Sequence, residues 1–225
     1  MTMKEINSED YHDFVFNNNK LIGEFEQMYV KSAEIPWHQD KQSSWLDVRM
    51  GKELLKEYGE FDYINDLGCG FGYFLDTIAK TVATKTAVLE GYDISQTCLH
   101  KAKRMFPTSI FDLVDLASGD IVPTYTKAKK RLFLMRGVFF CVYPKIGEVV
   151  EALSKTIRTD DLLYIAQNIP NKRKFAGSMV INDYLDILSI MNDEFRVSKF
   201  LVLRDKELKG TVNDVHWFIG TFRKR

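Results

Sequence analysis

Three glycines and one acid stand together at residues 66–72, which read DLGCGFG. Gly68, Gly70 and Gly72 follow directly after a short apolar run. Glycine permits tight turns and lets a ligand approach the main chain, so the pattern indicates a ligand-binding loop. Because Asp66 lies two positions before the first glycine, its carboxylate favours a cationic ligand over a phosphate.

Two common phosphate-binding patterns do not match this loop. A dinucleotide-binding loop of the form GxGxxG would place its third glycine at position 73, where the chain has Tyr73. A Walker-type loop requires a Gly-Lys-Ser/Thr sequence, and these residues contain no lysine. The loop therefore indicates a ligand that is not held by its phosphates.

The stretch DLGCGFG matches a D-x-G-C-G-x-G signature and so resembles the class I S-adenosylmethionine-dependent methyltransferases. The resemblance extends over about residues 61–225. It implies that S-adenosyl-L-methionine is the cofactor and S-adenosyl-L-homocysteine the product. This cofactor carries a sulfonium, an amino group and a ribose but no phosphate, as the acid in the loop favours. The resemblance implies cofactor-binding roles for five residues of the loop: Asp66, Gly68, Cys69, Gly70 and Gly72.

A second acid follows the next predicted strand, in the sequence EGYDIS. Asp93 lies 25 positions after Gly68 and resembles the acid with which the family binds both ribose hydroxyls. A carboxylate suits a diol because its two oxygens accept two hydrogen bonds. Ile94 is expected beside it in the cofactor site. Glu90 competes for the same role, although the G-x-D-x-S pattern favours Asp93.

Two later strand ends complete the implied cofactor site. Asp115, in FDLVDLA, resembles the residue that binds the adenine amino group, and Leu116 is expected to add a backbone or apolar contact. Asp112 is the competing acid in that stretch. Arg136, in MRGVFFCV, is predicted to border the methionine part of the cofactor and to pair with its carboxylate. An arginine that serves packing or an internal salt bridge is the alternative.

The segment FEQMYVKSAEIPWHQDKQSSW, residues 25–45, is the candidate acceptor site. Methyl transfer requires the enzyme to align the acceptor and to remove its proton. His38 is the candidate general base; alternatively it anchors the segment through hydrogen bonds. Trp37 and Gln39 are predicted to contact the substrate or cofactor. Tyr29 is a further substrate-binding candidate, or else a packed aromatic residue.

The segments EFEQMY, PWHQ and HWFIGTFRK resemble small bacterial methyltransferases of sugar and surface-polysaccharide modification. This implies O-methylation of a sugar or of a phosphorylated or nucleotide-linked precursor in polysaccharide biosynthesis. N-methylation of an amino sugar or small amine is the enzymatic alternative. A non-catalytic, methyltransferase-like binding subunit is the alternative from another class. The sequence shows no acidic cluster of the magnesium-binding type, so we expect no metal.

Strand-like and helix-like segments alternate from residue 61 onward. Strands are predicted at 62–67, 86–93, 109–116, 131–137, 161–168, 195–205 and 211–225. Helices are predicted at 73–83, 95–106, 145–157 and 179–191. This alternation predicts a doubly wound, Rossmann-like α/β fold whose seven strands are mostly parallel. The last two strands lack a helix between them and predict an antiparallel edge hairpin with a turn near 207–210.

Residues 1–60 do not follow this alternation. They contain a predicted helix at 43–58 and an irregular, aromatic-rich stretch before it. We therefore predict a helical N-terminal cap or lid over residues 1–60 and a cofactor-binding methyltransferase domain over residues 61–225.

Composition narrows the class of partner. The chain has 31 basic and 31 acidic residues, and short basic runs at 127–131 and 171–174 are predicted to be solvated. This argues against a nucleic-acid partner. The three cysteines form no CxxC pair, which indicates neither zinc nor disulfides and fits the cytoplasm. No apolar stretch is long enough for a bilayer. We expect a monomer or homodimer that acts on a small-molecule acceptor.

Overall fold

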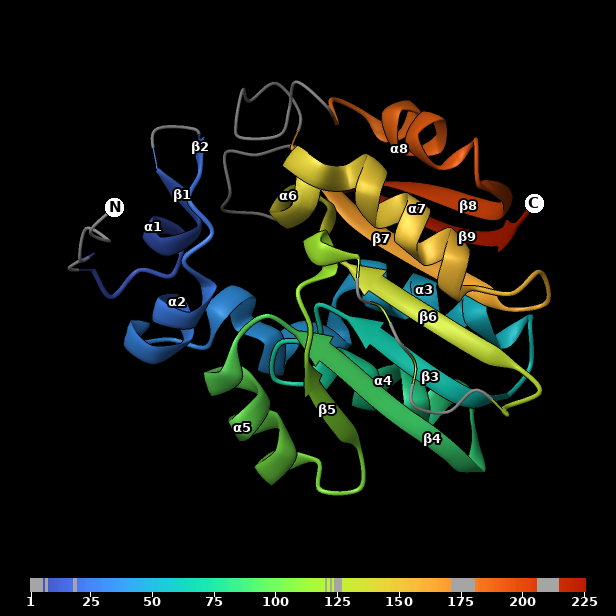
Figure 1. Ribbon diagram of the computed structural model, residues 1–225, viewed down its shortest axis with the longest axis horizontal. Helices are drawn as coiled ribbons and strands as arrows, with labels where there is room; N and C mark the ends of the chain where they lie inside the picture. The colour runs from blue at the N-terminus through green and yellow to red at the C-terminus, as the bar shows by residue number, and fades with distance from the viewer. Residues whose placement is uncertain are drawn as a thin grey trace.

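The computed structural model describes residues 6, 8–17, 20–119, 121, 123, 127–170, 181–205 and 215–225. The basic run predicted at 171–174 and the turn predicted at 207–210 lie outside these residues. The centre is a seven-stranded sheet in the order β5-β4-β3-β6-β7-β9-β8 (Figure 1). Its strands are β3 (Phe61–Leu67), β4 (Ala83–Asp93), β5 (Ile110–Leu113), β6 (Arg131–Arg136), β7 (Leu162–Pro170), β8 (Phe195–Asp205) and β9 (Val215–Lys224).

The strand order reverses in the middle of the sheet. From β3 the chain moves outward through β4 to β5, then returns to pair β6 and β7 on the other side, all in parallel. β9 is antiparallel to both β7 and β8, which confirms the predicted edge hairpin. In such sheets, ligands bind beyond the carboxyl ends of the strands at the reversal, here between β3 and β6.

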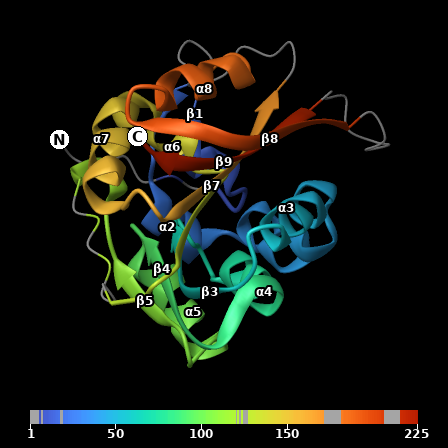
Figure 2. The same ribbon diagram turned by 90° about the vertical axis from the view of Figure 1, so that its right-hand side faces the viewer.

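Helices cover both faces of the sheet (Figure 2). One face packs against α3 (Leu46–Lys56), α4 (Tyr73–Val82) and α5 (Gln96–Met105). The other packs against α6 (Phe139–Val142), α7 (Ile146–Thr156) and α8 (Tyr184–Met191), with the short 3₁₀ turn η3 (Tyr143–Lys145) between α6 and α7. The buried residues of α4 recur at helical spacing, at Phe74, Leu75, Ile78, Ala79 and Val82.

The central strands are buried on both faces because helices cover both. In β6, Phe133 faces the core beneath α7, whereas Leu132 and Leu134 face the core beneath α4. This alternation follows the two-residue period of a strand. It explains why β6 is a continuous apolar run rather than an alternating one.

Two elements are shorter than predicted. β5 ends at Leu113 because the chain turns at Asp115, whose side chain accepts a hydrogen bond from the Ala117 amide and caps the 3₁₀ turn η2 (Leu116–Ser118). α8 begins at Tyr184 because the Asp183 side chain caps it. In both cases an aspartate competes for backbone N–H groups and ends or begins the element.

The N-terminal segment lies beyond the carboxyl ends of the parallel strands (Figure 1). It comprises α1 (His12–Val15), β1 (Phe16–Asn17), β2 (Lys20–Leu21), α2 (Phe25–Lys31) and the 3₁₀ segment η1 (Pro36–Ser44). The helix predicted at 43–58 is α3, which packs on the sheet beside α4. None of the helices in the described ranges has the length and apolarity required to cross a membrane.

Candidate functional site

The loop between β3 and α4 is a left-handed turn at three glycines. Gly68, Gly70 and Gly72 have φ angles of +80°, +52° and +82°, a region that only glycine enters freely. An added Cβ on Gly70 would lie 2.5 Å from Gln39 Oε1, and one on Gly72 would lie 2.9 Å from Phe111 Cζ. Gly68 lines a cavity at the sheet edge, whereas Gly70 and Gly72 pack against other parts of the chain.

Backbone hydrogen bonds attach this loop to the end of β4. The amides of Gly68 and Cys69 both donate to the Tyr92 carbonyl at 2.8 Å. The Gly70 amide donates to Asp93 Oδ2 at 2.9 Å. The loop is therefore held in place by the strand that also supplies the second predicted acid.

Asp93 lines the cavity from the end of β4, with Ile94 beside it. Its second oxygen, Oδ1, accepts a hydrogen bond from the Ser95 amide at 3.0 Å. Burial raises the pKa of Asp93, while these backbone hydrogen bonds oppose the increase. The competing acid, Glu90, lies in the core and accepts a hydrogen bond from the Tyr63 hydroxyl, away from the cavity lining.

Asp66 lines the same cavity from the end of β3. Only 2% of the residue is exposed, and its buried Oδ2 has no hydrogen-bond partner among the described residues. Burial raises the pKa of Asp66 to about 7, although the nearby Arg136 guanidinium acts in the opposite direction. A buried acceptor without a partner suits a ligand that brings a cation or an N–H donor.

Asp115 and Leu116 reach the cavity from the turn after β5. Asp115 is exposed and also caps η2, whereas Leu116 is buried. The competing residue Asp112 does not belong to the lining. Acids from three adjacent strand ends, β3, β4 and β5, therefore share one cavity.

Arg136, at the end of β6, lines the cavity but already has a carboxylate partner. Its Nε and Nη2 donate to Asp47 Oδ2 at 2.9 and 2.7 Å, and its Nη1 donates to Gln42 Oε1 at 2.5 Å. Three aromatic rings surround the guanidinium, with centroids at 5.7, 5.4 and 4.7 Å: Trp45, Phe74 and Trp217. A role in binding the cofactor carboxylate must therefore compete with an internal ion pair.

The turn that carries Trp37 and His38 is strained. Both residues have positive φ angles, 53° and 49°, which cost energy for any residue other than glycine. Both side chains line the cavity. His38 Nδ1 lies 3.7 Å from Glu34 Oε2, and 42% of the His38 side chain is exposed. The geometry leaves the imidazole accessible from the cavity.

Gln39 and Tyr29 connect the N-terminal segment to the glycine loop. Gln39 Oε1 accepts a hydrogen bond from the Phe71 amide at 2.9 Å, and its Nε2 donates to the Tyr29 hydroxyl at 3.2 Å. The Tyr29 ring packs edge-on against Phe71 with centroids 5.0 Å apart. Both residues also line the cavity, but their polar groups are engaged within the chain.

A carboxylate that the sequence did not single out fastens α2 to α5. Glu26 accepts hydrogen bonds from Ser95 Oγ at 2.6 Å and from the Thr97 amide at 3.2 Å, and also from the Thr97 hydroxyl. The nearer of these two partners, Ser95, is two residues beyond Asp93 in the sequence. These hydrogen bonds fix the N-terminal segment next to the cavity.

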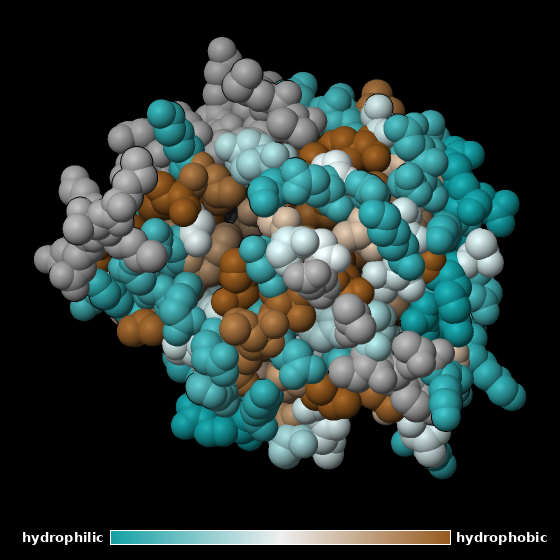
Figure 3. Space-filling view, in the orientation of Figure 1, coloured by the Kyte–Doolittle hydropathy of each residue, from teal (hydrophilic) through white to brown (hydrophobic). Residues whose placement is uncertain are grey.

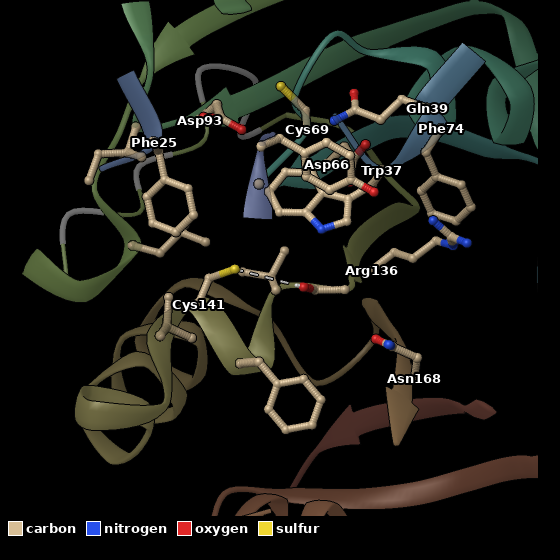
Figure 4. Close-up of a pocket in the computed structure, with 18 of the residues that line it drawn as sticks. Phe25, Trp37, Gln39, Asp66, Cys69, Phe74, Asp93, Arg136, Cys141 and Asn168 are labelled. Atoms are coloured by element: carbon tan, nitrogen blue, oxygen red, sulfur yellow. Dashed lines mark hydrogen bonds between the residues drawn. The ribbon is translucent and has the colours of Figure 1, made fainter. Parts of the chain in front are cut away.

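These parts enclose a cavity of about 450 Å³. Hydrophobic residues gather around a hollow between the N-terminal segment and the rest of the molecule (Figure 3). In the close-up, Asp93, Cys69 and Gln39 lie on one side, and Cys141 and Asn168 lie on the opposite side (Figure 4). Twelve of the fourteen residues predicted from the sequence line this cavity; Gly70 and Gly72 do not.

No family model and no curated protein matches this sequence. Solved structures do match. NodS, an N-methyltransferase from Bradyrhizobium japonicum WM9 in complex with S-adenosyl-L-homocysteine, has a TM-score of 0.64 at 12% identity, over 88% of this chain and 97% of NodS. A SAM-dependent methyltransferase from Aquifex aeolicus has a TM-score of 0.60 at 15% identity, over 84% and 96%. The fold is that of S-adenosylmethionine-dependent methyltransferases.

The same fold also occurs in the [4+2]-cyclase SpnF, with a TM-score of 0.62 at 11% identity, over 90% of this chain and 96% of SpnF. The methyltransferase fold alone therefore does not establish methyl transfer.

Several lining residues were not predicted from the sequence: Tyr11, Gln42, Trp45, Asn168 and Trp217. Asn168 ends the strand predicted at 161–168, and that position was the available signal; Trp217 lies inside the strand predicted at 211–225, where no local signal marked it. Asp47 does not line the cavity but pairs with Arg136. No local pattern indicated this ion pair, because Asp47 lies on a helix 89 residues before Arg136.

Proposed function

We propose that this protein is an S-adenosylmethionine-dependent methyltransferase that acts on a small-molecule acceptor. The observation that carries the proposal is the convergence of Asp66, Asp93 and Asp115, from three adjacent strand ends, on one cavity beside Gly68. The unpartnered Oδ2 of Asp66 fits a cofactor that brings cationic and N–H groups. The bound S-adenosyl-L-homocysteine in NodS, which shares the fold, supports this choice.

In this proposal each side chain binds a different part of the cofactor. Asp93 accepts hydrogen bonds from the two ribose hydroxyls, and Asp115 accepts one from the adenine amino group. Ile94 and Leu116 supply apolar contacts to the base. Asp66, with the loop at Gly68 and Cys69, receives the amino group of the methionine part. When bound, the cofactor supplies an activated methyl group on its sulfonium sulfur.

The N-terminal segment then aligns the acceptor and excludes water. In this proposal the acceptor contacts fall to Trp37, Gln39 and Tyr29, which line the cavity from this segment. We propose His38 as the group that takes the acceptor's proton, since its imidazole is accessible from the cavity. A hydroxyl acceptor benefits from such a base because its pKa is high.

Both acceptor types predicted from the sequence enter this proposal. O-methylation of a sugar or sugar precursor rests on the resemblance of the terminal segments. N-methylation of an amine is favoured by one observation, the N-methyltransferase activity named for NodS. In solution the protein is proposed to act as a monomer or homodimer.

Calorimetry tests the cofactor assignment. We expect S-adenosyl-L-homocysteine to bind at one site. Asp93→Ala is expected to weaken binding about 100-fold or more, because two charge-assisted hydrogen bonds are lost. Asp112→Asn is the matched control, since this acid lies outside the cavity lining, and should bind like the unaltered protein. Failure of both S-adenosylmethionine and its product to bind would exclude the proposed function.

Transfer of a labelled methyl group tests catalysis separately from binding. The panel comprises sugars, amino sugars and simple amines, each offered with labelled cofactor. Transfer to any of them supports the enzyme, whereas tight cofactor binding without transfer supports the non-catalytic subunit. His38→Ala should retain cofactor affinity and lose turnover; unchanged turnover would remove His38 from the mechanism.

A further inference from the structure

A buried glutamine fixes the orientation of Asn168 at the end of β7. Gln167 is 0% exposed, and its Oε1 accepts a hydrogen bond from the Phe139 backbone amide at 3.1 Å. A backbone amide only donates, so the glutamine nitrogen must point the other way. This nitrogen donates to the backbone carbonyl of Asn168 at 3.1 Å and to its side-chain oxygen, Oδ1, at 2.9 Å.

This arrangement leaves the Asn168 nitrogen for a ligand. Because Gln167 can only donate to it, the atom of the Asn168 amide that faces Gln167 must be oxygen. The Nδ2 group forms no hydrogen bond with any described part of the chain, and Asn168 lines the cavity. Its amide projects into the cavity from the side opposite Asp93 and Cys69 (Figure 4). The site therefore presents N–H donors and needs an acceptor oxygen.

The surroundings of Asn168 are apolar or already neutralised. Trp217, on β9, is its directly paired neighbour, and Phe140 and Val142 line the same cavity. Among the described lining residues there is no lysine, and the single arginine, Arg136, is paired with Asp47. This half of the cavity thus offers aromatic surface and a hydrogen-bond donor, and it offers no unpaired cation for a phosphate.

The two histidines of the lining do not supply an unpaired cation either. His12 Nδ1 lies 2.9 Å from Asp10 Oδ1, and His38 Nδ1 lies 3.7 Å from Glu34 Oε2, so each faces a carboxylate. The other charged groups of the lining are the acids Asp66, Asp93 and Asp115, which repel a phosphate. A phosphorylated or nucleotide-linked acceptor fits this lining poorly.

We propose that the acceptor is a small uncharged molecule with an aromatic or apolar body and a carbonyl, ether or hydroxyl oxygen, and that this oxygen accepts a hydrogen bond from Asn168 Nδ2. Gln167 is the positioning residue that keeps the donor toward the cavity. The inference rests on the proposed function, because it takes the half of the cavity away from the glycine loop as the acceptor site.

Three probes with one ring in common test the proposal on protein loaded with S-adenosyl-L-homocysteine. Benzamide has an acceptor oxygen, benzylamine has a cation and no acceptor, and phenyl phosphate is an anion. Affinities are measured by NMR titration. We expect benzamide to bind roughly tenfold or more tightly than either other probe. Benzylamine has no acceptor for the Asn168 donor, and phenyl phosphate brings a negative charge into a cavity lined by acids. No detectable benzamide binding, or tighter binding of phenyl phosphate, would overturn the proposal.

Asn168→Asp keeps the shape but replaces the donor with an acceptor. It should weaken benzamide binding roughly tenfold and strengthen benzylamine binding, with cofactor-product affinity unchanged within about twofold. Gln167→Glu should reverse selectivity in the same way, because its carboxylate accepts from Asn168 and turns that amide around. Asn192→Asp, on an exposed residue bonded to Arg225, is the control and should change neither affinity.

Unchanged benzamide affinity in Asn168→Asp would contradict the inference. If the unaltered protein does not bind S-adenosyl-L-homocysteine at all, the proposed function is contradicted instead. The failure of the inference and the failure of the proposed function are therefore distinguishable.

Discussion

The two halves of the cavity are built in different ways. In the half that we propose to hold the cofactor, the backbone amides of the glycine loop make the contacts. The loop and its acid are close in sequence there, since Gly70 and Asp93 are 23 residues apart. Where the N-terminal segment and α3 meet the sheet, side chains bond to side chains over long separations: Arg136 lies 89 residues from Asp47 and 94 from Gln42. Local geometry therefore holds the first half, while the rest of the cavity depends on how the N-terminal segment docks.

Asp66→Asn should have the largest effect on stability, within the cofactor half. Folding raises the pKa of Asp66 to about 7, so the ionised form is disfavoured in the folded protein and stability falls as pH rises from about 4 to about 7. Asparagine removes this penalty. We expect the ligand-free variant to be more stable by about 3–4 kcal/mol at about pH 8, and little changed near pH 4.

Urea unfolding at the two pH values measures this difference. Asp112→Asn serves as the control, because that acid lies outside the cavity lining. Cofactor-product affinity should fall in Asp66→Asn even as stability rises. A variant less stable than the unaltered protein at the higher pH would contradict the assignment of Asp66 as a strained, buried acid.

Gly70→Ala tests the junction between the two halves. A Cβ there would lie 2.5 Å from Gln39 Oε1 and 2.8 Å from the Tyr29 hydroxyl, in a backbone with φ of +52°. We expect a loss of about 2–3 kcal/mol from strain and crowding together. Gly137→Ala is the matched control, since its φ is +73° and nothing lies within 4 Å of the added carbon.

The difference between these two variants isolates the contact with the N-terminal segment. Adding Gln39→Ala to Gly70→Ala should recover part of the loss, as measured by chemical denaturation. Equal losses in Gly70→Ala and Gly137→Ala would show that the segment does not press on the loop.

Glu26→Gln tests the docking of α2 on α5. Partial burial alone would raise the pKa of Glu26, but hydrogen bonds from Ser95 and Thr97 outweigh it and lower the pKa. The stabilisation that the Glu26 carboxylate gives the folded protein is therefore complete above about pH 4.5, and it is lost as pH falls through the lowered pKa. We expect the substitution to cost about 1 kcal/mol or less at neutral pH, because the site is largely exposed.

Thermal unfolding at about pH 7 and at successively lower pH checks this dependence, since the difference between the variant and the unaltered protein should shrink as Glu26 becomes protonated. Glu53→Gln is the control, because Glu53 pairs only within α3, with Lys56. A difference that persists in acid would mean that the carboxylate charge is not what fastens α2.

His38→Gly should have the smallest effect on stability. Glycine relieves the positive φ of 49°, whereas alanine does not, so the glycine variant should exceed the alanine variant in stability by about 0.5–1 kcal/mol. Both lack the imidazole, and both should lose turnover equally if His38 is the base. Turnover that follows stability instead would assign His38 a structural role.

The prediction from sequence succeeded where spacing along the chain sets the geometry. Strand and helix alternation predicted the sheet and its edge hairpin, and Ser95 was correctly placed at the start of α5. It was less exact where side chains compete for backbone groups, since Asp115 ends β5 early by capping η2. It also did not anticipate that Gln39 would occupy the space beside Gly70.

The sequence by itself determined the part of the cavity that we propose to hold the cofactor. A glycine loop after β3 and acids after β4 and β5 converge automatically, because parallel strands bring their carboxyl ends to one edge. Only the tertiary structure decided how the rest of the cavity is assembled. The partner of Arg136, the docking of Glu26 and the direction of the Asn168 amide depend on contacts between distant segments, and no local pattern records which side chains will meet.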